Sequence, residues 1–418
     1  MTTKLAELSA RIDADPADGS TLRLVGQAFV KQREKHDAGV ALSLAARAFI
    51  AAGQLPMAIV VAKELSLVDH ASASKMVDEL ATAFGKGSKR VDASFRRRPP
   101  PPPTLLEPEE EESSANDKEV ARAALQRAAA RIDGMSPTPL PAFPLFHSLK
   151  PGPFRRLVAA ARVKDYPAGA TIIELGSTGD SFYVVARGAV CISRPRQAGS
   201  EDEVVLSHLR AGAIFGEMAL LTETPRTAHA TTETEALILE IARKSLDELA
   251  AAEPEFAAVL ADYTRDRLLQ NLLLTSALFV GLEPSAKQTL LSRFTARVAQ
   301  PGERILDEGT PNASLFLVAS GQLDVQKQEK DSARLQVKTL GPGDVVGEIS
   351  LLSGGPCTAS VRAATRSVLL TLSRDDFNAI ASQYPTVTAH LNDLALQRLE
   401  DLERLISEEV IEAEDYLI

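Results

Sequence analysis

The chain has 418 residues, enough for two or three domains that each bury a core of their own. Its 46 lysines and arginines are outnumbered by 56 aspartates and glutamates, giving a formal charge of −10. This balance argues against a broad nucleic-acid-binding face, because such a face needs basic residues to displace phosphate counterions. It leaves room for one basic pocket that binds a small anion.

The cysteines and the N-terminal segment indicate a cytoplasmic protein. Cys191 and Cys357 are too few for a disulfide framework, as is typical of a reducing compartment. The start, MTTKLAELSARIDAD, carries charges where a signal peptide would be apolar. The apolar run from Leu268 to Leu282 is too short for a bilayer. The histidines are scattered without metal-ligand spacing, so we expect neither a membrane span nor a metal site.

Residues 1–88 are predicted to form an all-α domain. Alanine and leucine recur at helical spacing in LSLAARAFIAAGQLPMAIVVAKEL, and Gly53 and Pro56 separate the helices of a pair. Phe49, Gly53 and Ala58 have the spacing of tetratricopeptide helix hairpins, although the repeat of about 34 residues is missing. A small helical bundle fits the pattern equally well.

Residues 89–115 are predicted to be a disordered linker. The segment RRRPPPPPTLLEPEEEESS combines a basic triplet with prolines and glutamates. It contains too little apolar surface to repay the entropy of ordering, and polyproline stays extended. A helix within residues 116–136 follows it.

An internal repeat organises the rest of the chain. Glycines recur 133 residues apart, and a later block recurs 131 residues apart, which fits a two-residue change at a hairpin tip. The first set pairs Gly169, Gly176 and Gly188 with Gly302, Gly309 and Gly321; the second pairs Gly216, Glu217, Pro225, Thr227 and Ala228 with Gly347, Glu348, Pro356, Thr358 and Ala359.

Each copy reads as a small β-roll with helices at its ends. Short β-branched runs such as SFYVVARGAVCIS and SLFLVASGQLDVQK are bounded by glycines and predict strands. Arg187-Gly188 and Ser320-Gly321 lie between such runs and predict tight hairpin turns. We therefore predict an α+β protein with two tandem β-rolls (jelly rolls) at residues 137–275 and 276–418, preceded by the all-α domain.

The stretch IFGEMALLTETPRTAHATT in the first copy has the features of a phosphate-binding loop. Gly216 permits close approach of the backbone, and residues 217–221 predict one helical turn whose free N–H groups can receive an anion. Arg226 follows Pro225 and can bond two phosphate oxygens with its planar guanidinium. Glu217 would repel a phosphate, so it is better explained as an acceptor for sugar hydroxyls. A triphosphate loop, GxxxxGK[ST], is absent from the sequence.

FGEMALLTETPRTA resembles the phosphate-binding cassette of the cyclic nucleotide-binding domain family, in the order found in regulatory subunits of cAMP-dependent protein kinase. The resemblance covers two tandem domains. It implies that Arg226 pairs with the cyclic phosphate and Glu217 with the ribose 2′-hydroxyl. The other ligand-binding residues that it implies are Phe215 and Ile192, the latter touching the base, and the backbone of Gly216, Met218, Ala219 and Thr227. The hydroxyl of Thr227 keeps cGMP open beside cAMP.

The second copy, VGEISLLSGGPCTASVRA, has Cys357 where the first has Arg226. Losing one side of a desolvated ion pair costs about 2–5 kcal/mol, or roughly 30- to several-thousand-fold in affinity. We expect the second roll to bind cyclic nucleotide very weakly or not at all, although Glu348 is retained. It can serve another ligand or act as a packing module. Arg362 alternates into a strand and is not expected to replace the missing arginine. A buried small residue explains Cys357 better than a redox sensor does.

These features predict a non-enzymatic sensor of cAMP or cGMP that relays binding to partner proteins through its flanking helices and its N-terminal helices. A scaffold with ligand-free rolls and an inhibitor resembling kinase regulatory subunits are the alternatives; for the latter, SFRRRPPPPP has proline at critical positions. The acidic C-terminal segment LALQRLEDLERLISEEVIEAEDYLI argues against DNA binding. No catalytic constellation is evident in the sequence. Whether the chain forms a homo-oligomer stays open.

Overall fold

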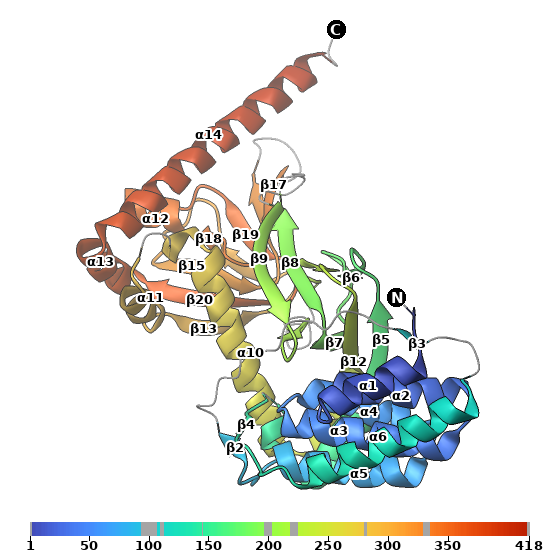
Figure 1. The fold of residues 1–418 in the computed structure, drawn as a ribbon. Helices are drawn as coiled ribbons and strands as arrows, with labels where there is room; N and C mark the ends of the chain where they lie inside the picture. The colour runs from blue at the N-terminus through green and yellow to red at the C-terminus, as the bar shows by residue number, and fades with distance from the viewer. Residues whose placement is uncertain are drawn as a thin grey trace. The chain divides into compact units, whose positions relative to one another are not determined.

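The computed structural model describes residues 2–92, 107–108, 113–143, 145–195, 203–217, 225–279, 282–328 and 335–415. It divides into two compact units, drawn with their elements labelled in Figure 1. The first unit comprises residues 1–174, 180–217 and 228–263, and the second comprises 175–179, 218–227 and 264–418. The predicted linker falls largely outside the described residues.

The N-terminal region folds into helix hairpins, as its apolar spacing predicts. Consecutive helices pack against each other from α1 to α5, and the core between them is apolar. Gly53 ends α3 with a φ of 69°, a conformation that favours glycine, while Pro56 lies in the first turn of α4. The tetratricopeptide resemblance itself stays a prediction. The helices are α1 (Leu5–Ala14), α2 (Gly19–Lys31), α3 (Lys35–Ala51), α4 (Leu55–Ser66) and α5 (His70–Phe84).

The helix after the predicted linker, α6 (Ala115–Asp133), returns to this helical domain and packs against α1 and α3. Its buried face is mostly alanine, which lets the helices approach closely. Arg122 pairs with Asp37 at 2.7 Å, and Arg127 pairs with Asp13 at 2.7 Å. Ser114 caps the helix by accepting a hydrogen bond from the backbone N–H of Asp117.

The first β-roll consists of two four-stranded antiparallel sheets. One sheet has the order β10-β7-β12-β5 and the other the order β6-β11-β8-β9. Apolar residues on the inner faces form one core between the sheets. The strands are β5 (Arg162–Tyr166), β6 (Thr171–Ile173), β7 (Ser181–Arg187), β8 (Ala189–Pro195), β9 (Glu203–Arg210), β10 (Ile214–Phe215), β11 (His229–Thr232) and β12 (Ala236–Ala242).

The elements around this roll are helices and two short parallel ladders. The helices are α7 (Pro151–Ala160), α9 (Arg243–Ala252), α10 (Pro254–Thr275) and the 3-10 turns η1 (Phe146–Ser148) and η2 (Ala277–Phe279). The ladders pair β1 (Thr2–Thr3) with β3 (Glu107–Pro108) and β2 (Val91–Asp92) with β4 (Leu140–Pro141).

The second roll repeats the first strand for strand, with sheets ordered β18-β15-β20-β13 and β14-β19-β16-β17. This confirms the repeat that the glycine spacing predicted. Its elements are α11 (Pro284–Leu291), β13 (Thr295–Ala299), β14 (Arg304–Leu306), β15 (Ser314–Ser320), β16 (Leu323–Lys327), β17 (Leu335–Leu340), β18 (Val345–Val346), α12 (Glu348–Ser353), β19 (Ser360–Ala363), β20 (Ser367–Ser373), α13 (Arg374–Gln383) and α14 (Pro385–Asp415).

The predicted hairpin turns at Gly188 and Gly321 are wrong. The strands before and after Gly188, β7 and β8, belong to different sheets, so the chain turns a corner there rather than pairing with itself. Gly188 has a φ of 92°, and a Cβ at this position would lie 2.5 Å from the carbonyl oxygen of Glu235. Gly321 has the same role beside Ser367. The real hairpin joins β8 to β9, within the stretch where the repeat spacing changes from 133 to 131.

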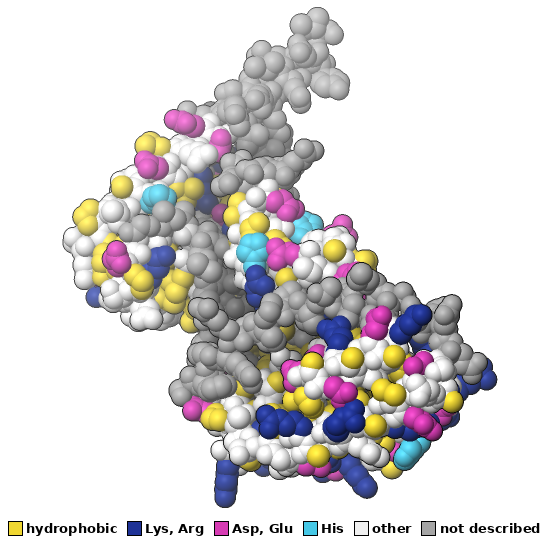
Figure 2. Space-filling view, in the orientation of Figure 1, with side chains coloured by type: hydrophobic (Ala, Val, Ile, Leu, Met, Phe, Trp, Pro, Cys, Tyr) yellow, Lys and Arg dark blue, Asp and Glu magenta, His cyan; other side chains and the backbone are white. Residues whose placement is uncertain are grey.

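Charged side chains of both signs are mixed over the helical domain on the face in Figure 2, where basic residues do not gather into one patch. Across the described part of the chain, the helices are too short or too polar to cross a bilayer.

Candidate functional site

The backbone places Arg226 and Cys357 at equivalent positions of the two rolls. The N–H of Arg226 donates to the carbonyl of Ser177 at 2.9 Å, and the Arg226 carbonyl accepts from Gly176 at 2.8 Å. In the second roll the N–H of Cys357 donates to Thr310 at 2.9 Å, and its carbonyl accepts from Gly309 at 2.8 Å. The two residues are therefore structural counterparts, as the sequence repeat predicted.

The charged residues expected to bind ligand in the first roll are both buried. Glu217, in the first unit, is 3% exposed, and Arg226, in the second unit, is 6% exposed. Charged residues are rarely buried to this extent unless another group compensates their charge. Gly216, which precedes the carboxylate, has a φ of 78°. Thr227 is half-buried.

The apolar residues expected at this site contribute to the core of the first roll. Phe215 stacks on Tyr183 with ring centroids 5.1 Å apart, and Ile192 is half-buried against the same core. Met218 and Ala219, whose backbone was expected to line the phosphate hole, lie outside the described residues. The part of each residue in ligand binding stays a prediction.

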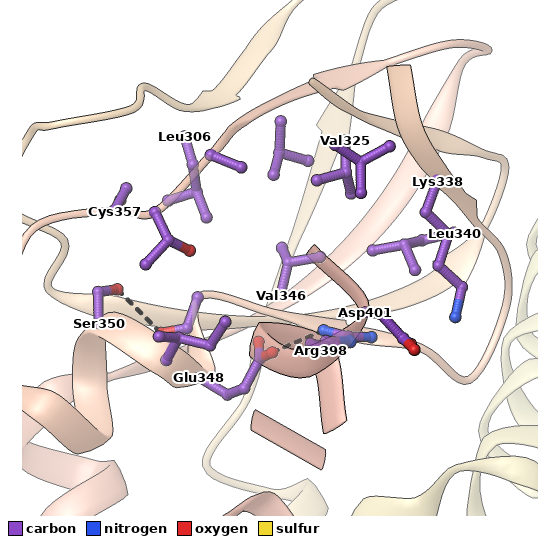
Figure 3. Close-up of a pocket in the computed structure, with 16 residues that line it drawn as sticks. Leu306, Val325, Lys338, Leu340, Val346, Glu348, Ser350, Cys357, Arg398 and Asp401 are labelled. Carbon is purple, nitrogen blue, oxygen red and sulfur yellow. Dashed lines mark hydrogen bonds and ion pairs between the residues drawn. The ribbon is translucent and has the colours of Figure 1, made fainter. Parts of the chain in front are cut away.

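The second roll contains a cavity of about 240 Å³. Figure 3 shows Cys357 near Leu306 and Ser350 at one end, and Arg398, Asp401 and Lys338 at the other. Apolar side chains of the roll line much of the wall between the two ends. They are Leu306, Val325, Val337, Leu340, Val346 and Val361.

Tight backbone packing shapes the floor of this cavity. Gly347 precedes α12 with a φ of 87°, and a Cβ there would lie 2.6 Å from the carbonyl oxygen of Ser314. The amide nitrogen of Asn312 donates to the carbonyls of Ser314 at 2.7 Å and Gly347 at 3.2 Å, and to the hydroxyl of Ser350 at 3.0 Å. These bonds fix the loop from which Glu348 begins the helix.

Glu348 has a partner that sequence reasoning missed. The carboxylate is 2% exposed, and Arg398 of α14 donates to it at 2.7 Å and to the carbonyl of Val345 at 2.6 Å. The signal was present in the sequence, because Arg267 and Arg398 are separated by the same 131 residues as the cassettes. Arg362, by contrast, donates from β19 to the carbonyl of Gly302 and does not line the cavity, as predicted.

Cys357 is 6% exposed, and burial raises the pKa of its thiol, partly opposed by hydrogen bonds with Ser350 and Thr310. The thiol is therefore protonated and uncharged near neutral pH. This agrees with a buried small residue rather than a reactive thiolate.

Strand pairing in the first roll brings together three side chains that the sequence separates. Ligand atoms of Cys191, His208 and Glu233 lie within 4.8 Å of one another, and Nδ1 of His208 lies 2.6 Å from a Glu233 oxygen. Burial, followed by the charges of Glu233 and Glu203, raises the pKa of the Cys191 thiol. Residue spacing along the chain cannot reveal such a group, and the expected absence of a metal site stays a prediction.

An eight-stranded roll with a glycine-gated loop and closing helices defines a small-ligand-binding domain, present here twice. The cyclic nucleotide-binding domain family model matches residues 163–253 and again residues 296–384. The chain thus carries two tandem domains of the cyclic nucleotide-binding family, as the cassette predicted.

Similar curated proteins include regulatory subunits of cAMP-dependent protein kinase. The one from Yarrowia lipolytica is 30% identical over 238 residues, covering 56% of this chain and 58% of that protein. The type II subunit of Drosophila melanogaster is 25% identical over 219 residues, covering 52% and 54%. This chain therefore spans little more than half the length of these relatives. Among solved structures, the regulatory domain of Toxoplasma gondii PKA with cAMP is 23% identical, with 60% of this chain and 92% of that chain covered and a TM-score of 0.30.

Proposed function

We propose that this protein is a non-enzymatic sensor of a cyclic mononucleotide, cAMP or cGMP, which binds in the first roll. Arg226 neutralises the cyclic phosphate, and Glu217 accepts hydrogen bonds from the ribose. The observation that carries this proposal is the burial of Arg226 at the cassette position whose counterpart in the second roll is an uncharged thiol. A buried guanidinium beside a glycine-gated turn suits one anionic ligand.

The relay to partner proteins is proposed to run through the helices that follow the first roll. Phe256 and Leu260 of α10 are buried in the part of the helix that belongs to the first unit. Leu268 and Leu272, farther along the same helix, belong to the core of the second unit. A ligand shifts this helix only by binding one of its arrangements more tightly than another.

The partner is proposed to be a protein that contacts the N-terminal helices, and the setting is proposed to be the cytoplasm. The names of the similar proteins favour one particular partner, the catalytic subunit of a protein kinase. Co-purification of such a kinase with the chain, and its release by cyclic nucleotide, would distinguish this candidate from other partners.

Calorimetric titration of the full chain with cAMP and with cGMP tests the ligand. We expect one nucleotide to bind per chain, and Arg226→Ala to weaken binding by roughly 30- to several-thousand-fold. Cys357→Ala is the matched control, because it alters the equivalent position without removing a charge, and it should leave this affinity unchanged. Absence of binding by either nucleotide, or an Arg226→Ala affinity equal to that of the wild type, would contradict the proposal.

A further inference from the structure

The charges that line the cavity of the second roll cancel. Glu348 and Asp401 are its acidic residues, and Arg398 and Lys338 are its basic ones. Arg398 already pairs with Glu348, which it contacts at 2.7 Å. Lys338 is exposed, and an ammonium in contact with water adds little to the binding of an anion. The cavity therefore offers no net positive charge to a ligand.

The end of the cavity that corresponds to the phosphate site is uncharged. Cys357 replaces the arginine there, beside Ser350 and Thr358. Lys327 lies on the neighbouring strand, but its ammonium is held by Glu308 at 2.7 Å and by the carbonyl of Thr358 at 2.7 Å, and it does not line the cavity. A cyclic phosphate placed at this end would lose its hydration without gaining a counter-charge, which is unfavourable.

The rest of the cavity keeps what an uncharged nucleoside needs. The valine and leucine side chains of the strands offer apolar walls to a planar base. The Glu348 carboxylate, oriented by Arg398, can accept hydrogen bonds from sugar hydroxyls. The volume of about 240 Å³ is below the roughly 300–1,000 Å³ common for drug-sized ligands, and so favours a small ligand.

We propose that the second roll is a binding site for an uncharged nucleoside and discriminates against the corresponding cyclic nucleotide. Cys357 is the residue that sets this preference. It closes the end of the cavity with a small apolar group where an arginine would demand an anion. The two rolls of one chain then report on two ligands of different charge. The orientation of the nucleoside in this cavity rests on the family assignment and on the proposed function of the first roll.

The test is calorimetry on the full chain with adenosine, guanosine, cAMP and cGMP. Binding to the second roll is isolated in two ways: in Arg226→Ala, and in wild type whose first roll is saturated with its cyclic nucleotide. We expect a nucleoside to bind under both conditions at least about 10-fold more tightly than the cyclic nucleotide binds to Arg226→Ala. Val325→Phe, which fills the cavity, should abolish nucleoside binding and leave cyclic nucleotide binding by the first roll intact.

Exchange of the single discriminating residue gives the sharpest outcome. In the Arg226→Ala background, Cys357→Arg should raise the affinity for cyclic nucleotide by about 30-fold or more and lower that for the nucleoside. Cys357→Ser, which stays uncharged, should keep the nucleoside preference. The inference is overturned if no nucleoside binds, if Val325→Phe leaves nucleoside binding unchanged, or if the unaltered second roll binds cyclic nucleotide as tightly as nucleoside. Failure of the proposed function would look different, because wild type would then bind no cyclic nucleotide through the first roll while nucleoside binding by Arg226→Ala persisted.

Discussion

Replacement of Arg398 by methionine is expected to destabilise the second roll strongly. The substitution keeps most of the volume of the side chain but removes both of its hydrogen bonds, to Glu348 and to the carbonyl of Val345. The Glu348 carboxylate, only 2% exposed, is then left buried without a counter-charge.

The size of the effect follows from this burial. Breaking a buried ion pair by removing one partner costs about 3–5 kcal/mol, because the remaining charge is desolvated and uncompensated. The side chain of Arg398 is 16% exposed, so water can reach part of the space it leaves, and we expect about 3 kcal/mol, the lower end of that range. For a domain of about 150 residues, this corresponds to a melting temperature lower by roughly 6–12 °C.

Differential scanning calorimetry of the full chain is the appropriate assay. The chain has no tryptophan, so intrinsic tryptophan fluorescence cannot report on either roll. Calorimetry also separates the transitions of domains that do not unfold as one cooperative unit. Only the transition of the second roll should move to lower temperature.

The control is the double variant Glu348→Gln with Arg398→Met, which removes both charges. It should recover most of the lost stability, since an amide in place of the carboxylate carries no uncompensated charge. The reasoning is refuted if Arg398→Met melts like the wild type, or if the double variant is no more stable than the single one.

Two further predictions concern backbone conformation and pH. Gly321→Ala should destabilise the second roll far more than Gly302→Ala in thermal melts, because both glycines have positive φ but only at Gly321 would a Cβ meet Ser367, at 2.2 Å; equal losses would contradict this. The hydroxyl of Ser72, together with the N–H groups of Ser72 and Ala71, holds the pKa of Asp69 below its usual range at the start of α5, so this cap stabilises the helical domain above the ordinary carboxyl pKa and is lost as the pH falls through the lowered value. Asp69→Asn should remove that part of the acid dependence in urea unfolding at different pH values, and an unchanged acid profile would show that the cap is not responsible.

The repeat was predictable because glycine with positive φ is required at fixed points of each roll. Gly176 and Gly309 have φ values of 80° and 76°, and side chains at such values are strained. The spacing of these glycines therefore records the fold twice in one chain. The helical domain was predictable for a similar reason, since its apolar residues follow the period of a helix.

The candidate site was predictable only where it is local in sequence. Gly216, Glu217 and Arg226 lie within one cassette, so their order along the chain already suggests their chemistry. Arg398 lies 50 residues after Glu348, on a helix whose approach to the cassette depends on packing of the second core. The group of Cys191, His208 and Glu233 likewise depends on strand pairing.

The sequence by itself determined that two rolls follow a helical domain, and that a guanidinium in one cassette is replaced by a thiol in the other. Tertiary structure alone decided that the glycines after β7 and β15 turn a corner between sheets, because alternation of apolar residues does not say which strand a neighbour pairs with. It also decided that a helix supplies the partner of Glu348 and that a charge-balanced cavity lies beside Cys357. Both depend on distances between residues far apart in the chain, which are set only when the core packs.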